Sequence, residues 1–477
     1  MAASRAETRT GGRAASTGVI PGDFALSVGK PDMPTQPGWC WTALSEVARL
    51  ETGHTPSRRH SEYWGGDVPW IGIKDATENH GRVISDTHQH TNDLGIANSS
   101  ARILPANTVC LSRTASVGYV VVMGRPMATS QDFVNWVCSD AIDWRFLKYV
   151  LLAERSAFLR FASGTTHQTI YFPEVKAFHV CLPPLTEQRA IVQILGTLDD
   201  KIELNRRMSD ALEAMAQALF KSWFVDFDPV RARTDGRRVG FAKRLDDLFP
   251  ARFVDSQLGE LPEGWRTSTF GDEARRRGGR IQTGPFGSQL HASDYVAEGI
   301  PVVMPKDLSR RRVSAFDIAR VGISDTERLS RHQLELGDIV YSRRGDVEQH
   351  GLIGAAEVGW LCGTGCLLVR LGPKWLSPLY ASLWLDQGNI RAWIVQHAIG
   401  ATMPNLNTDI LSRVPLLVPS DAVLQAFDEI AKPLHDRVVK SDEQSRTLAV
   451  LRDTLLPKLV SGELRINDAE KFIKRVA

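Results

Sequence analysis

The sequence lacks the marks of a membrane or secreted protein. Nowhere in its 477 residues is there an uncharged apolar run of about 18 residues, the length that spans a bilayer. It has only six cysteines, which are scattered along the chain, and it shows no convincing secretory signal. Both features predict reduced thiols and a cytoplasmic location. The two cysteines of CGTGC at 362–366 could bind a metal ion, but structural zinc needs four ligands and no second Cys or His pair lies at a suitable spacing. HQH at 88–90 is weaker evidence for a metal site. We therefore predict no metal site.

Motifs for catalysis are also missing. The sequence has no GxxxxGK[ST] loop, no GxGxxG after a strand, no HExxH or GxSxG, and no Asn/Asp-Pro-Pro-aromatic tetrad. Glycine-rich GGRIQTGPFG at 278–287 lacks the Lys-Ser/Thr ending, so we interpret it as a loop with turn glycines. Asp226 and Asp228 resemble paired metal carboxylates, but they stand where a helix breaks at Pro229, as turn residues do. We predict a chain without catalysis or a bound cofactor.

Excess charge of one sign is absent. The formal net charge is +2, whereas a dedicated phosphate binder usually carries a plainly basic domain, so any nucleic-acid surface must be local. Residues 1–36 hold Arg5, Arg9 and Arg13 without an amphipathic repeat, which favours a disordered leader or an over-long start over a targeting peptide. The triple Arg310–Arg312 is interpreted as a solvated face, with DNA backbone contact as the alternative.

What the sequence does contain is an internal duplication. Five segments of the first half return in the same order: PGWCW at 37–41 as PEGWR at 262–266, PWIGIKD at 69–75 as PVVMPKD at 301–307, VCLSRTASVG at 109–118 as VYSRRGDVEQHG at 340–351, SGTTHQTI at 163–170 as IGATMPNL at 399–406, and VCLPP at 180–184 as LLVPS at 416–420. The offset grows from 226 residues (39 to 265) to 236 (164 to 400), as insertions in loops would produce.

Beyond these segments the offset stays at 236, and apolar residues repeat at steps of three and four. The first copy gives Ile191, Ile194, Leu198, Ile202, Leu212, Met215 and Leu219, and the second gives Phe427, Ile430, Leu434, Val438, Leu448, Leu451 and Leu455. This spacing predicts one narrow apolar stripe on each of two long helices, the first about 55 Å long, that pair as a coiled coil. Asn205 lies on the stripe, either fixing register opposite Ser441 or at a solvated edge.

Short strand-like runs, such as TVCLS and DIVYS, and one helical stretch, at 145–162 or 379–398, precede each long helix, which predicts an α+β fold with two tandem modules. The expected domains are a leader at 1–36, a first module at 37–185, a long helix at 186–228, a connector at 229–260, a second module at 261–420, a second long helix at 421–466 and a tail at 467–477.

The ends of the two copies resemble the conserved regions of specificity subunits of type I restriction-modification systems. The resemblance is carried by PPLTEQRAIVQILGTLDDKIELNRRMSDALEAMAQALFKSWFVDFDPV at 183–230 and LRDTLLPKLVSGELRI at 451–466. PSDAVLQAFDEI at 419–430 departs from it, because it lacks a Glu-Gln pair like Glu187 and Gln188, so the second helix is expected to begin differently.

This resemblance implies a non-catalytic subunit with two target-recognition modules. Its helices would pair antiparallel with pseudo-two-fold symmetry, and each module would read one half-site of double-stranded DNA on either side of an unread gap. Two modification subunits would dock on the coil and around Trp223–Pro229, and restriction subunits would join them. S-adenosylmethionine, ATP and Mg would be bound by those partners.

Candidate DNA contacts are polar side chains at matching places in the two modules. They are Lys74, Ser112, Arg113, Thr114, Thr165, Thr166, His167 and Gln168 in the first, and Lys306, Ser342, Arg343, Arg344, Thr402 and Asn405 in the second. Most are expected to touch phosphate rather than bases. Each also has an ordinary structural alternative, such as a turn hydrogen bond or a solvated surface.

Two other classes of function remain open. One is a coiled-coil interaction scaffold, or a degenerate specificity subunit, that does not bind DNA; its binding would not weaken steeply with salt. The other is a fused enzyme with its own methyltransferase or nuclease, against which the missing cofactor motifs argue.

Overall fold

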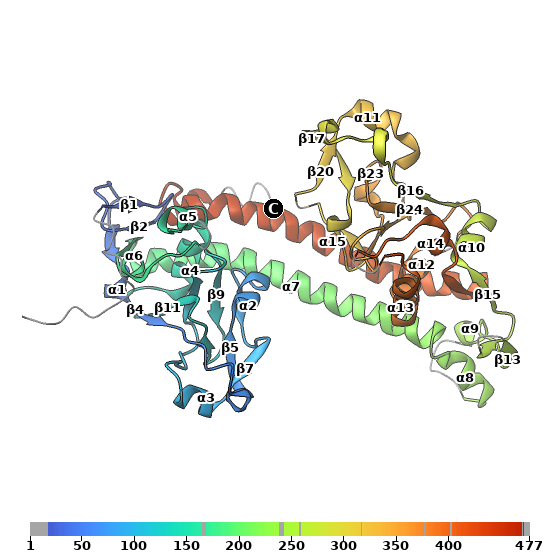
Figure 1. The fold of residues 1–477 in the computed structure, drawn as a ribbon, viewed down its shortest axis with the longest axis horizontal. Coiled ribbons are helices and arrows are strands. Elements are labelled where there is room, and N and C mark those ends of the chain that lie inside the picture. The colour runs from blue at the N-terminus through green and yellow to red at the C-terminus, as the bar shows by residue number, and fades with distance from the viewer. Residues whose placement is uncertain are drawn as a thin grey trace, which may run out of the picture. The chain divides into compact units, whose positions relative to one another are not determined.

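The computed structural model describes residues 18–164, 168–237, 243–256, 259–315, 317–375, 377–400, 403–469 and 471. The chain divides into two compact units, Met1–Leu204 with Gln444–Ala477 and Asn205–Glu443. Each unit therefore contains one α+β module and a part of both long helices (Figure 1). Among the described residues, no helix combines the length and apolar character needed to cross a membrane.

The first module is built on three sheets. Their strand orders are β1 (Ile20–Pro21), β2 (Leu26–Val28), β12 (Phe178–Leu182), β3 (Cys40–Ala43); β4 (Ala48–Thr52), β11 (Phe133–Cys138), β8 (Val109–Ser112), β9 (Val120–Met123), β6 (Val83–Ile84); and β10 (Ala128–Thr129), β5 (Trp64–Ile71), β7 (Gln89–Thr91). Its helices are α1 (Leu44–Val47), α2 (Ile73–Glu78), α3 (Asp93–Ala97), α4 (Trp144–Ala153), α5 (Ala157–Phe161) and α6 (Phe172–Lys176). All four residues of β8 and of β9 are buried, which explains why their sequences read as continuous apolar runs.

The predicted disordered leader is wrong from residue 18 onward. Strands β1 and β2 extend the sheet of β12, and Ala25 and Leu26 are buried. The carboxylate of Glu154 accepts backbone N–H groups from four consecutive residues, Asp23 to Leu26, at 2.6–3.1 Å. Residues 1–17 of the predicted leader lie outside the described residues. A side chain more than 120 residues away orders this segment, so no local pattern announces it.

The second module repeats this plan. Its main sheets have the orders β16 (Arg280–Thr283), β24 (Cys366–Arg370), β21 (Ile339–Ser342), β22 (His350–Leu352); β20 (Ala319–Val321), β17 (Tyr295–Val303), β23 (Leu361–Cys362); and β15 (Arg266–Thr269), β25 (Pro415–Val418). Two hairpins are formed by β18 (Leu308–Ser309) with β19 (Arg312–Val313) and by β13 (Phe253–Ser256) with β14 (Gly259–Pro262). Its helices are α10 (Phe270–Arg276), α11 (Ile323–Arg328), α12 (Pro378–Leu385), α13 (Gly388–His397) and α14 (Thr408–Ser412). The duplication predicted from the sequence is thus a duplication of structure.

The predicted polar connector at 229–260 is more ordered than expected. It contains α8 (Asp228–Thr234) and α9 (Lys243–Asp246), and its Phe249 packs on Trp223 with ring centroids 4.8 Å apart. Phe227 has φ = 57°, so the chain turns sharply between the long helix and α8. Asp226 pairs with Lys221 at this turn, which confirms the turn interpretation of the acidic residues.

Two helices, α7 (Leu185–Phe224) and α15 (Asp421–Val460), each contain 40 residues, drawn green and red in Figure 1. At 1.5 Å per residue each is about 60 Å long. In the first unit Asp199 pairs with Arg452, and in the second Asn205 lies against Ser441. Because residue numbers rise along α7 as they fall along α15, the helices are antiparallel, as the resemblance implied.

Most members of the predicted stripe are shielded from solvent, and Ile191, Leu198 and Leu455 belong to one apolar core in the first unit. Seven members are buried: Ile191, Ile194, Leu198, Phe427, Val438, Leu451 and Leu455. Five are half-buried: Ile202, Leu212, Leu219, Leu434 and Leu448. The prediction is wrong for Met215 and Ile430, which are 57% and 39% exposed, because their neighbours Ala216 and Ala431 occupy the seam. Adjacent helical positions point about 100° apart, so only one residue of each pair can face inward. The spacing assigned the larger apolar residue to the stripe, whereas its smaller neighbour is the buried one.

The two long helices also begin differently, as expected. In α7 the side chain of Gln188 donates to the carbonyl oxygen of Pro183 and accepts the backbone N–H of Asp143, each at 2.9 Å, and Trp39 donates to Glu187 at 3.0 Å. In α15 the first residue, Asp421, instead pairs with Arg277 at 3.0 Å.

Candidate nucleic-acid interface

In the first unit three segments meet at the turn that follows β8. The backbone N–H of Arg113 donates to the carbonyl oxygen of Asp132, and its carbonyl oxygen accepts from Ile170, both at 2.8 Å. Thr114 forms an isolated bridge with Thr169, and their hydroxyls lie 2.8 Å apart. The turn at 112–118 is thus fixed to the segments 130–132 and 168–170. Chain stretches far apart in sequence form one polar surface here.

A fourth segment, the loop after β4, joins this surface. His54 donates its backbone N–H to the carbonyl oxygen of Thr129 at 2.9 Å, and the side chains of Thr55 and Gln131 are hydrogen-bonded. A Cβ at Gly53 would lie 1.9 Å from the carbonyl oxygen of Ser130, so only glycine fits. The guanidinium of Arg58 lies 4.3 Å from the ring centroid of Trp64. Cation and aromatic surface therefore stand together beside the turn.

The second unit builds the same assembly with different side chains. The backbone of Arg343 bonds to Gly365 at 2.8 Å and to Leu406 at 2.9 Å, and Arg344 bridges to Asn405. The loop after β16 joins through the Thr364 hydroxyl, which donates to the carbonyl oxygen of Pro285 at 3.0 Å. Thr-Gly at 52–53 and 283–284 is thus a further repeat, in ETGHTPS and QTGPFGS, of which only the second copy was interpreted from sequence, as a loop with turn glycines.

Two predicted contacts, Ser112 and Ser342, are buried. Ser112 accepts the backbone N–H of Tyr119 at 2.9 Å, and Ser342 donates to the carbonyl oxygen of Arg344 at 3.2 Å. Their hydroxyls fill turn positions, which was the structural alternative for these residues. Both serines hold the shape of the turns.

The predicted arginines and amides lie closer to the surface. Arg113 and Arg343 are half-buried, and each donates to a backbone oxygen of a neighbouring segment, Gln131 and Leu406, at 3.2 Å. Burial lowers the pKa of Arg113 from its ordinary value. Arg344 and Gln168 are exposed, and Asn405 is half-buried. Thr165, Thr166, His167 and Thr402 lie outside the described residues.

The two predicted lysines lie on other elements. Lys74, on α2, is 3.9 Å from Glu78, and Lys306, in the 3-10 helix η4 (Pro305–Asp307), is 3.6 Å from Asp317. Both are exposed. The structure gives each of them a local acidic partner rather than a place on the turn.

The tips of the two assemblies differ in polarity. In the second unit Phe286, Ile399 and Met403 are 56%, 61% and 64% exposed. At the corresponding offsets of 231 and 236 residues, the first unit has Thr55 for Phe286 and Ser163 for Ile399. The second assembly therefore presents an apolar surface beside its arginines. The contacts predicted from sequence were all polar or charged residues, so this surface was not among them.

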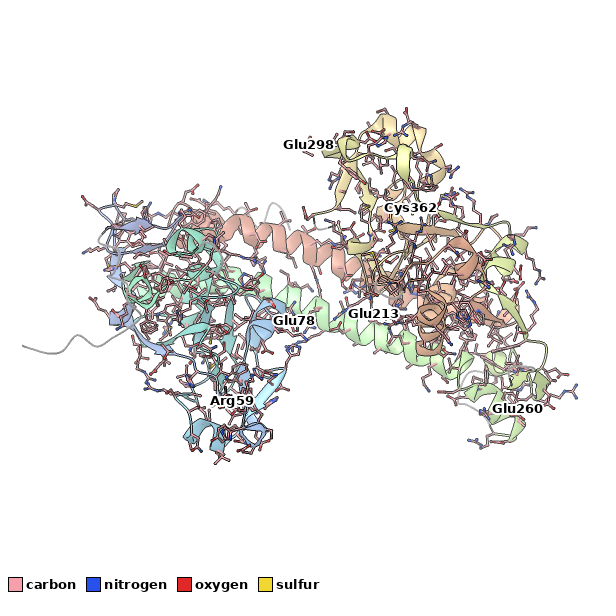
Figure 2. The ribbon with its side chains drawn as sticks, in the orientation of Figure 1. Arg59, Glu78, Glu213, Glu260, Glu298 and Cys362 are labelled. Carbon is pink, nitrogen blue, oxygen red and sulfur yellow. The ribbon has the colours of Figure 1, made fainter. Side chains whose placement is uncertain are left out.

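The cysteines of CGTGC lie in a core rather than at this surface. Cys362, labelled in Figure 2, and Cys366 are buried on β23 and β24, and burial raises the pKa of both thiols. Within the part of the chain that the structure describes, no three His, Cys, Asp or Glu side chains are placed to share a metal ion.

Comparisons with known proteins agree with this architecture. Residues 38–214 match the family model described as the type I restriction modification DNA specificity domain. The specificity subunit of the type I restriction enzyme MjaIX of Methanocaldococcus jannaschii is 26% identical over 435 residues, 90% of this chain and 94% of the relative. The HindI specificity subunit of Haemophilus influenzae is 26% identical over 343 residues, 63% of this chain and 72% of the relative.

A solved structure shares the fold. The S subunit of a type I restriction-modification system from M. genitalium superposes with a TM-score of 0.54 at 17% identity, covering 90% of this chain and 98% of that one.

Proposed function

Since this chain belongs to the family of type I restriction-modification specificity subunits, we propose that it reads a bipartite DNA sequence, one half-site with each module. One observation carries this proposal: the same assembly of a turn, the segment bridged to it (at Thr169 or Asn405) and a Thr-Gly loop recurs in both units, built once around Arg113 and once around Arg343. A duplicated surface with changed side chains suits two different half-sites.

Within each assembly the residues take different roles. Arg344, Gln168 and Asn405 offer directed donors or acceptors to base edges, together with Thr165, Thr166, His167 and Thr402. Arg113 and Arg343 support the turns and reach phosphate, while Ser112, Ser342 and the Thr114–Thr169 pair hold the shape of the surface. Lys74 and Lys306, each with a local acidic partner, contact phosphate at the edge of the surface.

This chain recognises the DNA sequence, and partner subunits catalyse methylation and cleavage. Two modification subunits bind the coil and the turn after α7, restriction subunits complete the complex, and S-adenosylmethionine, ATP and Mg are bound by these partners in the cytoplasm. Trp223 is buried in the core of its own unit, so the exposed Val225 and Asp228 are the contacts that this turn offers.

The decisive experiment is genome-wide mapping of methylated bases. Cells express the modification subunit either with this chain or alone. A split motif that appears only with this chain supports the proposal and reveals both half-sites. A confirmed complex that creates no new motif overturns it in favour of the scaffold, whose binding would also be insensitive to salt.

A further inference from the structure

The arginine triplet at 310–312 matches the predicted solvated face only at Arg310, whose side chain is 71% exposed, and not at Arg311 or Arg312. It forms the turn of the hairpin between β18 and β19, where Ser309 pairs with Arg312. Arg310 and Arg311 have φ values of 49° and 61°, a left-handed backbone that hairpin turns normally give to Asn and Gly. The Arg311 side chain is only 9% exposed. Arginine at such strained positions indicates that the side chains themselves are needed.

The third arginine contacts both long helices. One guanidinium nitrogen of Arg312 donates a hydrogen bond to Glu213 of α7, labelled in Figure 2. The other terminal nitrogen donates to Asp442 of α15. The three side chains are 23%, 17% and 27% exposed, so the charges are largely removed from water. At this level the interface between the helices is itself polar, because Asn205, Ser209 and Ser441 are buried there. Directional ion pairs thus replace apolar packing at this point.

The other two arginines fix the same turn from its sides. Arg311 lies 3.5 Å from Asp386, which follows α12, and its carbonyl oxygen accepts the backbone N–H of Leu352 at 3.0 Å. Arg310 lies 3.5 Å from Asp210 of α7. The turn therefore links the second module to α7 and α15 through several charged contacts with defined directions.

The first unit has a counterpart with the opposite sign. Asp199 of α7 accepts from Lys148 at 3.1 Å and from the hydroxyl of Tyr149 at 2.8 Å, both on α4, and from Arg452 of α15 at 2.9 Å. Burial alone would raise the pKa of Asp199, but Lys148 and Arg452 hold it below its ordinary value. One charged group again joins a module to both long helices.

We propose that Arg312 and Asp199 are positioning residues that fix how each module is oriented on its part of the coil. A buried ion pair adds little net stability compared with apolar packing, but it admits far fewer geometries, so its best-supported use is to specify one arrangement. The inference rests on the proposed function: the orientation of a module determines which gap length between the half-sites is accepted.

The test uses the complex with the modification subunit and DNA that carries both half-sites at gaps from two base pairs shorter to two longer. Arg312→Met keeps the length of the side chain and removes the charge. In this variant we expect the ratio of methylation at gaps one base pair shorter or longer to methylation at the native gap to rise by about tenfold. The half-site sequences should stay the same. Arg275→Met, which breaks an exposed ion pair with Asp272 on α10, is the matched control and should leave the gap preference unchanged.

Glu213→Gln leaves Asp442 in place and is measured in parallel, so that the comparison stands if Arg312→Met does not fold. Asp199→Asn makes the same test in the first unit. An unchanged gap preference in these variants, or an equal loss at every gap as a merely structural role would give, overturns the inference. Failure of the proposed function looks different, because the wild-type complex would then recognise no split site at all.

Discussion

The side-chain amide of Asn205 in α7 donates to the backbone carbonyl oxygen of Ser441 in α15 at 3.4 Å, and both residues are buried. The solvated-edge alternative for Asn205 is therefore wrong. A polar residue in the seam of a coiled coil specifies register at a cost in stability.

We therefore expect Asn205→Leu to raise the thermal unfolding temperature of the chain, because it removes a buried amide whose desolvation costs about 1 kcal/mol or more. Differential scanning calorimetry measures the change. Leu204→Ala alters a neighbouring side chain that is 57% exposed and should leave the temperature nearly unchanged. A lower unfolding temperature for Asn205→Leu would mean that its hydrogen bonds outweigh the desolvation cost.

Insertion of seven residues into each long helix should lengthen the unread gap by about three base pairs, because a heptad adds about 10.5 Å of helix. The insertions belong in α7 and α15 at matching levels, since the helices are antiparallel. Mapping of the methylated motif gives the new gap. An insertion in α7 alone should instead reduce methylation at every gap. An unchanged gap after the paired insertion would refute the idea that the length of the two long helices sets the gap.

Arg344→Ala should weaken DNA binding and reduce the slope of log affinity against log salt by about one, because one cation leaves the interface. Arg344 is exposed and stands on the bridge to Asn405. Fluorescence anisotropy with a short duplex across a salt series measures both quantities. Arg275→Ala removes an equally positive exposed side chain and should change neither. A weaker affinity with an unchanged slope would assign Arg344 a role other than charge contact.

Phe286→Ala should weaken recognition of one half-site by about tenfold, if the exposed ring contacts thymine methyl groups in the major groove. Replacing the thymines of that half-site by deoxyuridine removes only the methyl group, so it should weaken binding of the wild type but not of the variant. Val358→Ala, at another exposed apolar residue of the same unit, is the control. Equal effects of deoxyuridine on both proteins would exclude the methyl contact.

The sequence predicted those features that repeat or that are locally periodic. The short runs at Val109–Ser112 and Ile339–Ser342 became β8 and β21, and Ile191, Ile194 and Leu198 of the predicted stripe are buried. Such patterns are written within one element and can be read there.

Features that depend on distant partners were not predictable. Glu154 orders residues 23–26 from more than 120 positions away, and Arg312 meets acids 99 and 130 residues away. Gly53 and Gly284 are required by backbone atoms of other segments. In each case the sequence shows a charged residue or a glycine, but only the folded structure shows which distant residue it contacts.

The free energy of unfolding should fall as pH drops from 6.5 towards 3, in part because of His350. Burial, and then the nearby charge of Arg311, lower the pKa of this histidine from 6.5 to about 3. In the unfolded chain this histidine is protonated below pH 6.5, whereas in the native state it is protonated only near pH 3. Between these values the free energy of unfolding falls by up to about 1.4 kcal/mol for each pH unit.

His350→Gln removes this titration and should flatten the dependence by that amount, in urea titrations followed by tryptophan fluorescence between pH 7 and 4.5. The variant will also lose stability at every pH, since Nε2 of His350 lies 3.0 Å from the Ser382 hydroxyl, so the slope and not the midpoint is compared. An equal slope in wild type and His350→Gln would mean that His350 takes up its proton at the same pH in the native and the unfolded chain, which contradicts the expected effect of burial beside Arg311.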